Sequence, residues 1–181
     1  MIERILKILS CPVVVFGGLA ALCVAALAAA FGSEAFLGLE PCILCVYQRW
    51  PYAIVALLSL IGLAMRKNQV AARGLIGLNG LAFLLNSVIA FYHTGVEQKW
   101  WVSKVEGCKV PSFSDKPQSI LENIMSAPTA NCAEIPWQDP LLGLSMANYN
   151  AIMCFGLFIL CGLSFYAMRR KAQSVLSPEN Y

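Results

Sequence analysis

Four long apolar runs limit this chain to the folds that a lipid bilayer permits. They cover about residues 12–31, 46–65, 74–92 and 147–168, and their only charged residue is Arg49. A helix of about 20 apolar residues is long enough to cross a hydrocarbon core of about 30 Å. Only 13% of all residues are charged, which leaves too little polar surface for a soluble domain. The sequence therefore predicts an all-α membrane protein, a bundle of four transmembrane helices that forms one domain over residues 1–181.

The first run could instead belong to a cleaved signal peptide, with Ala28-Ala29-Ala30 as a small-residue cleavage site. The apolar part of a signal peptide is roughly 7–15 residues long. This run is 20 residues long, so the sequence favours a helix that stays in the protein.

Basic residues gather on one side of the four predicted spans. An even number of spans puts both termini and the turn after residue 65 on the same side, and that side carries Arg4, Lys7, Arg66, Lys67, Arg73, Arg169, Arg170 and Lys171. The first outer loop, about residues 32–45, contains no Lys or Arg. The second, about residues 93–146, contains four lysines. Because Lys and Arg collect in cytoplasmic segments, both termini are predicted to be cytoplasmic.

The long outer loop contains a helix signal of its own. Ser119-x-x-Glu122 fits a capping box, and apolar residues follow at helical spacing: Ile120, Leu121, Ile124 and Met125. We expect a short amphipathic helix on the membrane surface or packed inside the loop.

The eight cysteines divide into two groups of four. One group lies in or beside apolar runs, where cysteine usually serves as a small apolar residue, so we expect packing at Cys11, Cys23, Cys154 and Cys161. The other group lies in the outer loops: Cys42, Cys45, Cys108 and Cys132. Of the three possible pairings, a local bridge between the first two and a loop bridge between the last two is the simplest. A zinc site formed by all four is an alternative, although an oxidising compartment favours disulfides.

Cys42 and Cys45 form a Cys-x-x-Cys motif at the outer start of the second run. Pro41 suits the first turn of a helix, where unpaired N–H groups and the helix dipole would favour a thiolate on either cysteine. Arg49 follows Cys45 by one helical turn and would share its face. A permanent cation lowers the pKa of a nearby thiol and can hold an anionic ligand. The motif indicates a reactive dithiol, with a structural disulfide or half of a zinc site as alternatives.

These motifs together resemble the DsbB family, the bacterial membrane proteins of disulfide bond formation. The matching segments are Pro41-Cys42-x-x-Cys45-x-x-x-Arg49, Tyr92-His93-Thr94, Cys108, Cys132-Ala133-Glu134-x-x-Trp137 and Gly143-Leu144-x-Met146. The resemblance implies a quinone-dependent protein-thiol oxidoreductase. Such an enzyme reoxidises a periplasmic thioredoxin-fold thiol oxidase of the DsbA type and passes the electrons to a membrane quinone, ubiquinone or menaquinone. It also implies the bacterial inner membrane, with the outer cysteines in the periplasm.

The resemblance assigns a role to each candidate site residue, and none of them is a metal ligand. Cys108 would be attacked by the reduced partner, Cys132 would then attack Cys42, and Cys45 would be left as the thiolate that faces the quinone. For Arg49, its position one helical turn below Cys45 predicts a hydrogen bond to the quinone, with a snorkelling arginine that only anchors the helix end as the alternative. His93 is expected near it, with an ordinary interfacial histidine as the alternative.

Two other functions fit the same sequence. A conduit that carries reducing electrons outward would need reactive cysteines on both sides of the membrane. A non-catalytic membrane protein would use the two bridges only to tie down its loops, and both bridges would then resist a mild thiol donor.

The predicted topology can be tested with a reporter fused after Tyr181. Because the C-terminus is predicted to be cytoplasmic, a reporter that works only in the periplasm should be inactive there. Periplasmic activity of this fusion would contradict the topology.

Overall fold

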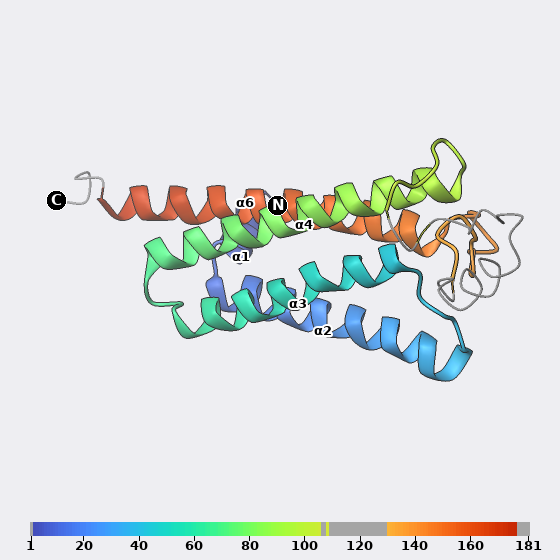
Figure 1. Ribbon diagram of the computed structural model, residues 1–181. Helices are drawn as coiled ribbons and strands as arrows, with labels where there is room; N and C mark the ends of the chain where they lie inside the picture. The colour runs from blue at the N-terminus through green and yellow to red at the C-terminus, as the bar shows by residue number, and fades with distance from the viewer. Residues whose placement is uncertain (1, 106–107, 109–129, 177–181) are drawn as a thin grey trace, which may run out of the picture.

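The computed structural model describes residues 2–105, 108 and 130–176. In this part of the chain the helices are, in order, α1 (Ile2–Leu9), α2 (Pro12–Leu37), α3 (Ile43–Ala64), α4 (Gln69–Glu97) and α6 (Met146–Leu176), as Figure 1 shows. Four of them are long and apolar enough to cross a membrane: α2, α3, α4 and residues Met146–Gln173 of α6. The structure confirms the predicted four-helix membrane bundle. The amphipathic helix expected near Ser119 lies outside the described residues.

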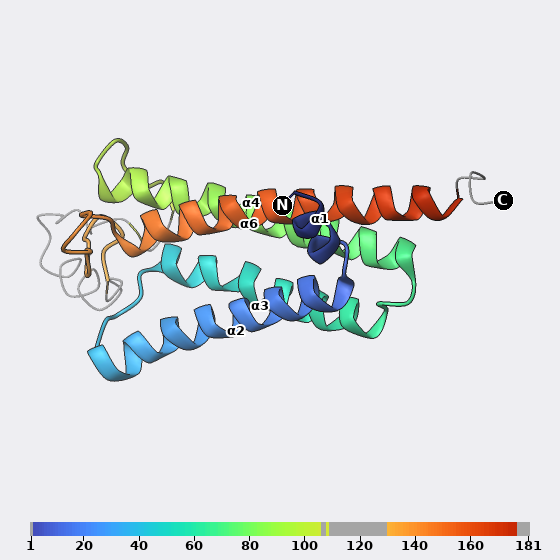
Figure 2. The same ribbon diagram turned by 180° about the vertical axis from the view of Figure 1, so that it is seen from behind.

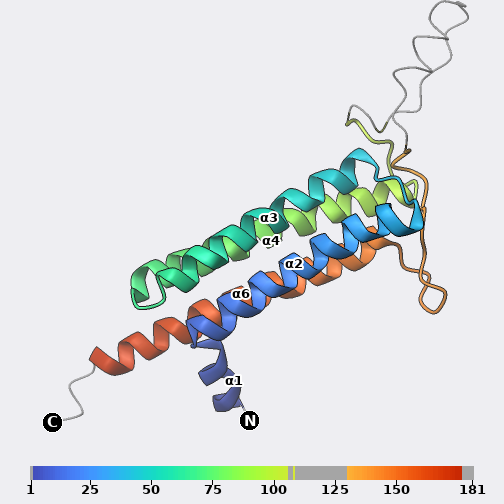
Figure 3. The ribbon, with the colours of Figure 1, turned by 90° about the horizontal axis from the view of Figure 1, so that it is seen from below.

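The long helices pack as two antiparallel pairs. Helix α2 lies against α3, α4 lies against α6, and α3 connects the pairs through its contact with α4 (Figures 1 and 2). The short helix α1 contacts α2 and α6. Figure 3 shows the last turns of α6 at one end of the bundle and the last turns of α2 and α4 at the other, with α1 beside the bundle near the start of α2. The residues that connect α2 with α3 lie at this second end, which we call the loop end.

The helices extend beyond the predicted spans. Helix α2 continues to Leu37, where Gly38 ends it with a left-handed φ of 63°. Helix α4 begins after Asn68, whose side chain accepts hydrogen bonds from two backbone N–H groups, and it continues to Glu97. The end of an apolar run marks where polar side chains begin. The backbone hydrogen bonds of the helix continue beyond this position, so the helix is longer than the run. His93 is therefore inside α4 and not at the start of a loop, and the first outer connection is shorter than predicted.

Polar side chains in the middle of the bundle are paired between helices. Asn79 of α4 donates to Ser59 of α3 at 3.1 Å, and Asn86 of α4 donates to the sulfur of Cys154 in α6 at 3.4 Å. All four side chains are fully buried. Both asparagines thus face neighbouring helices, and their hydrogen bonds connect α4 to α3 and α6.

Helices α2 and α3 approach closely at Gly62. A Cβ atom at this position would lie 2.6 Å from the ring of Phe16, which is fully buried. The glycine therefore sets how close the two helices can come.

Gly62→Ala should destabilise the bundle, because the new methyl group forces the Phe16 ring out of its place. Overpacking of this kind costs about 1–3 kcal/mol, which thermal unfolding of the detergent-solubilised protein would detect. Gly77→Ala is the matched control, since a Cβ there meets no atom within 4 Å. Equal melting temperatures for the two variants would contradict the packing described here.

Candidate redox site

Cys42 and Cys45 lie at the start of α3, at the loop end of the bundle. Cys42 is the N-cap residue, and its sulfur accepts a hydrogen bond from the backbone N–H of Cys45 at 3.4 Å. Pro41 precedes the cap, so only Cys45 lies in the first turn; the sequence had placed both cysteines there. The two sulfur atoms are 3.1 Å apart and not bonded to each other. The structure therefore describes this pair as a dithiol, whereas the sequence predicts the disulfide for the resting oxidised protein.

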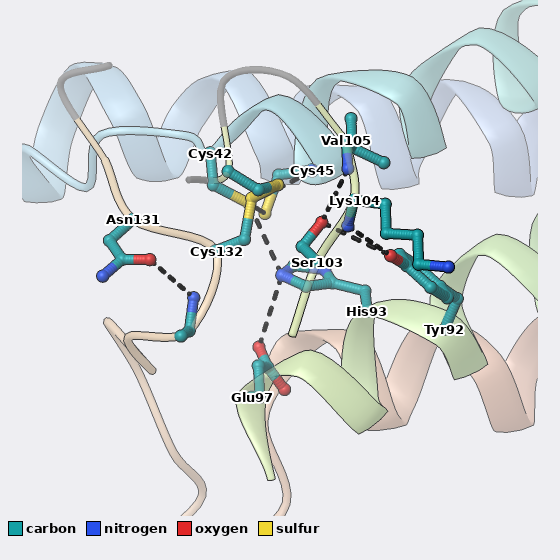
Figure 4. The surroundings of a disulfide bond; sticks show 12 residues. Cys42, Cys45, Tyr92, His93, Glu97, Ser103, Lys104, Val105, Asn131 and Cys132 are labelled. Carbon is teal, nitrogen blue, oxygen red and sulfur yellow. Dashed lines mark hydrogen bonds and ion pairs between the residues drawn. A yellow bond between two sulfur atoms is a disulfide. The ribbon is translucent and has the colours of Figure 1, made fainter. Parts of the chain in front are cut away.

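The second cysteine pair lies beside the first. Cys108 and Cys132 form a disulfide across 24 positions of the sequence, which is the predicted pairing. Both are buried in one apolar cluster with Cys42, and Figure 4 shows the Cys132 side chain pointing toward the Cys42–Cys45 pair. Because two of the four outer cysteines are bonded to each other, the structure does not support the zinc site that would use all four.

His93 joins the dithiol to helix α4. Its Nε2 atom lies 3.4 Å from the Cys42 sulfur and 3.8 Å from a carboxylate oxygen of Glu97, one turn further along the helix (Figure 4). The other carboxylate oxygen of Glu97 accepts a short hydrogen bond from Ser145. His93 and Glu97 are only 2% and 6% exposed.

Glu97 was not predicted as a site residue, because every residue after Tyr92 was expected in a loop. Its spacing of four residues from His93 is the signal that could have revealed it, since residues four apart share a helix face.

Hydrogen bonds lower the pKa of the Cys42 thiol well below its ordinary value. The largest cause is the hydrogen bond from the Cys45 thiol, followed by the contact with His93, while burial acts in the opposite direction. Cys42 is therefore the sulfur of this pair that the surrounding groups stabilise as a thiolate.

A cavity of about 470 Å³ lies on the other side of the dithiol. Its wall is mostly apolar and comes mainly from α2, α3 and α6, with Cys45, Gln48, Arg49, His93 and Glu97 among its polar members. Pockets of this size and character bind small organic molecules. Cys42 is a buried member of the cluster that contains the Cys108–Cys132 disulfide, and it does not line the cavity. Cys45 packs against that cluster from a partly buried position and also lines the cavity, so Cys45 is the thiol of this pair that reaches the cavity.

Arg49 lines the cavity but is not a free cation. Its guanidinium forms a short ion pair with Glu34 and lies 5.0 Å from the centre of the Phe31 ring. Both partners belong to the last turns of α2, beyond or at the end of the predicted first span. The ion pair and the aromatic ring hold the guanidinium in place beside the cavity.

The donor atoms of Cys42, Cys45 and His93 lie within 4.8 Å of one another, a grouping that could also suit a soft metal ion. The neighbouring disulfide and the cavity favour thiol exchange over metal binding as the chemistry of this group. A disulfide between Cys42 and Cys45 would remove two of the three atoms that could bind a metal.

Comparison with known proteins agrees with the site. Residues 13–164 match the family described as disulfide bond formation protein DsbB. The chain belongs to the DsbB family. Similar proteins named disulfide bond formation protein B include one from Xylella fastidiosa (strain Temecula1 / ATCC 700964), which is 32% identical over 160 residues and aligns with 82% of this chain and 87% of its own. Another, from Marinobacter nauticus (strain ATCC 700491 / DSM 11845 / VT8), is 29% identical over 164 residues, or 86% and 92% of the two chains.

No solved structure matches this chain. Membership in the DsbB family and the four candidate spans show a multi-pass membrane protein and support a role in disulfide bond formation as a disulfide-forming oxidoreductase. The sequence-based assignment to this family is confirmed.

The low pKa of Cys42 predicts that the reduced protein is alkylated at this residue at pH values well below the roughly 8.5 of an ordinary thiol. His93→Phe removes one of the hydrogen bonds and should move the midpoint to higher pH. Since the pKa is lower in the folded state, the thiolate stabilises the reduced fold above the unfolded-state pKa, and this stabilisation is lost as the pH falls through the folded-state value.

Mass spectrometry of the Cys42 peptide after alkylation at different pH values measures the midpoint. Thr94→Val is a matched control, because Thr94 is the next residue of α4 and its hydroxyl has no hydrogen-bond partner among the described residues. An ordinary midpoint in the unmodified protein, or the same shift in both variants, would contradict the assignment.

Proposed function

We propose that this protein reoxidises a periplasmic thioredoxin-fold thiol oxidase of the DsbA type and passes the electrons to a membrane quinone. One observation carries the proposal: the Cys42–Cys45 pair lies between the Cys108–Cys132 disulfide and the cavity. One pair of sulfur atoms could then exchange with a protein disulfide on one side and reduce a small molecule on the other. The names of the relatives, which refer to disulfide bond formation, support the first half of this proposal.

The exchange with the partner needs only thiolates and disulfides. A thiolate of the reduced partner attacks Cys108, the Cys108–Cys132 bond breaks, and Cys132 leaves as a thiolate. In the oxidised form of the site, Cys132 attacks Cys42, and Cys45 leaves with the electron pair of the broken bond. The positions of Cys42 in the disulfide cluster and of Cys45 on the cavity support this order. The second thiolate of the partner then closes the partner's own disulfide and releases Cys108 as a thiolate. Cys108 attacks Cys132 in the Cys42–Cys132 bridge, which restores the Cys108–Cys132 disulfide and leaves both electrons of the partner's dithiol on Cys42 and Cys45.

The cavity suits a quinone as the group that takes these electrons. A bound quinone would accept two electrons and two protons from the dithiol. Apolar side chains of the wall would contact the quinone ring, Arg49 places hydrogen-bond donors at the wall, and His93 also lines it. A guanidinium keeps its charge and can stabilise negative charge that develops on a carbonyl oxygen. Because Glu34 and Phe31 already hold the guanidinium, little reorganisation would be needed when the quinone binds.

The same function places the loop end on the periplasmic side of the bacterial inner membrane and both termini in the cytoplasm. The distribution of Lys and Arg supports this orientation, since the basic residues gather at the ends of the helices that are remote from the four outer cysteines.

The test is quinone reduction by the purified protein in lipid nanodiscs, supplied with a reduced thioredoxin-fold thiol oxidase. One quinone should be reduced for each partner dithiol that is oxidised. Arg49→Ala should raise the apparent KM for quinone roughly tenfold to hundredfold, the effect of losing one hydrogen bond to a charged group. Arg49→Lys should have a smaller effect, because it keeps the charge and loses the planar set of donors.

Formation of the mixed disulfide between Cys108 and the partner should continue at a near-normal rate in both variants, because it precedes the quinone step. Arg73→Ala, a change at a partly exposed arginine near the start of α4, is the control for loss of charge alone. The proposal fails if the unmodified protein reduces no quinone. The assignment of Arg49 fails if Arg49→Ala leaves the quinone kinetics unchanged.

A further inference from the structure

The partner of the second ring nitrogen of His93 points to the atom that carries the proton of this histidine. The Nδ1 atom lies 3.0 Å from the side-chain nitrogen of Gln48 in α3. An amide nitrogen donates hydrogen bonds and does not accept them, so Nδ1 must accept. The single proton of the neutral ring is then on Nε2, the atom that faces Cys42 and Glu97.

Gln48 cannot turn its amide round alone. Its oxygen accepts a hydrogen bond from the side-chain nitrogen of Asn150 in α6 at 2.6 Å. The oxygen of Asn150 in turn accepts from the hydroxyl of Tyr52 and, at 3.3 Å, from the thiol of Cys154. If Gln48 turned its oxygen toward His93, two amide nitrogens would face each other, and a buried donor would lose its acceptor. Both amides would have to reverse together.

We propose that Gln48 is a positioning residue: held by Asn150, it keeps Nδ1 of His93 free of a proton and so directs the Nε2–H group at the Cys42 sulfur. Cys42 and Glu97 present acceptors to Nε2, and Gln48 presents a donor to Nδ1. The backbone of Cys132 also lies within hydrogen-bond reach of the ring. Gln48 and His93 are 7% and 2% exposed, so bulk water does not compete for these bonds.

The catalytic role of this arrangement rests on the proposed function, to which it adds a step at Cys42. When the thiolate of Cys108 attacks Cys132 in a Cys42–Cys132 bridge, the bond between these two sulfur atoms breaks and its electron pair goes to Cys42. The leaving thiolate then meets an N–H donor that is already in place and needs no proton transfer. Tyr52, Asn150 and Cys154 lie deeper in the bundle, so the orientation of the donor at Cys42 depends on contacts between α3 and α6.

The chain contains a single histidine, so its ring can be observed without assignment. The experiment is nitrogen-15 NMR of the full-length protein, labelled at histidine, in lipid nanodiscs at neutral pH with the Cys42–Cys45 pair reduced. The chemical shifts of the two ring nitrogens report which of them carries a proton. The unmodified protein should show a proton on Nε2 and none on Nδ1, and a proton on Nδ1 in most molecules would overturn the proposal.

Two variants test the role of the amides. Gln48→Glu replaces the donor with a carboxylate, so Nδ1 should carry a proton in most molecules. Asn150→Asp places only acceptors beside Gln48, which should turn its oxygen toward His93 and protonate Nδ1 without a change in the residue that touches the ring. If Gln48→Glu does not fold, Asn150→Asp alone tests the proposal.

Gln98→Glu adds the same charge at an exposed position of the α4 end and should leave both signals unchanged. If Nδ1 carried no proton in a folded Gln48→Glu or Asn150→Asp protein, the proposal would be overturned. The measurement uses neither the partner nor a quinone, so failure of the proposed function would leave its outcome intact.

Discussion

The buried contact between Cys42 and His93 is the interaction on which the site depends. It joins the N-terminus of α3 to the middle of the last three turns of α4, and with the hydrogen bonds of Gln48 to His93 and Asn150 it connects the two helix pairs at the loop end. On one side of this contact lies the Cys108–Cys132 disulfide, and on the other lies the cavity with Cys45 at its wall. Cys42 is the N-cap residue, and its sulfur accepts a hydrogen bond from the backbone N–H of Cys45. Cys45 lies one helical turn before Arg49, and both residues line the cavity.

Polar groups that are buried in a membrane protein need partners, and this requirement organises the loop end of the bundle. An unpaired charge at membrane depth is costly, and functional sites are where such groups are usually retained. Here Arg49 has Glu34, Glu97 has Ser145 and His93, and Gln48 has Asn150. Each of these pairs except Glu97–His93, which lies within α4, joins two different elements. The hydrogen bonds that satisfy the polar groups therefore also fix the helices around the dithiol and the cavity.

The sequence was sufficient for the features that depend on local pattern. Four apolar runs predicted four spans, and the position of the Cys-x-x-Cys motif before the second run placed the dithiol at a helix start. The motif set also led to the correct family. Glu34 and Glu97 were missed because both helices continue beyond the apolar residues that marked the spans. The bond between Gln48 and Asn150 joins residues 102 positions apart, and no local pattern indicates such a contact. Cys154 was expected only to pack, but it also receives a hydrogen bond from Asn86 and donates one to Asn150.

The central claim is that Cys42 faces the loop disulfide and Cys45 faces the cavity. The most direct measurement is peptide mapping under non-reducing conditions, after an acid quench, of two single variants. In Cys45→Ser the remaining thiol of Cys42 should attack Cys132, so that a Cys42–Cys132 bridge accumulates and Cys108 becomes free. In Cys42→Ser the thiol of Cys45 should leave the Cys108–Cys132 disulfide intact. A Cys45–Cys132 bridge that forms as readily as the Cys42–Cys132 bridge would contradict the account.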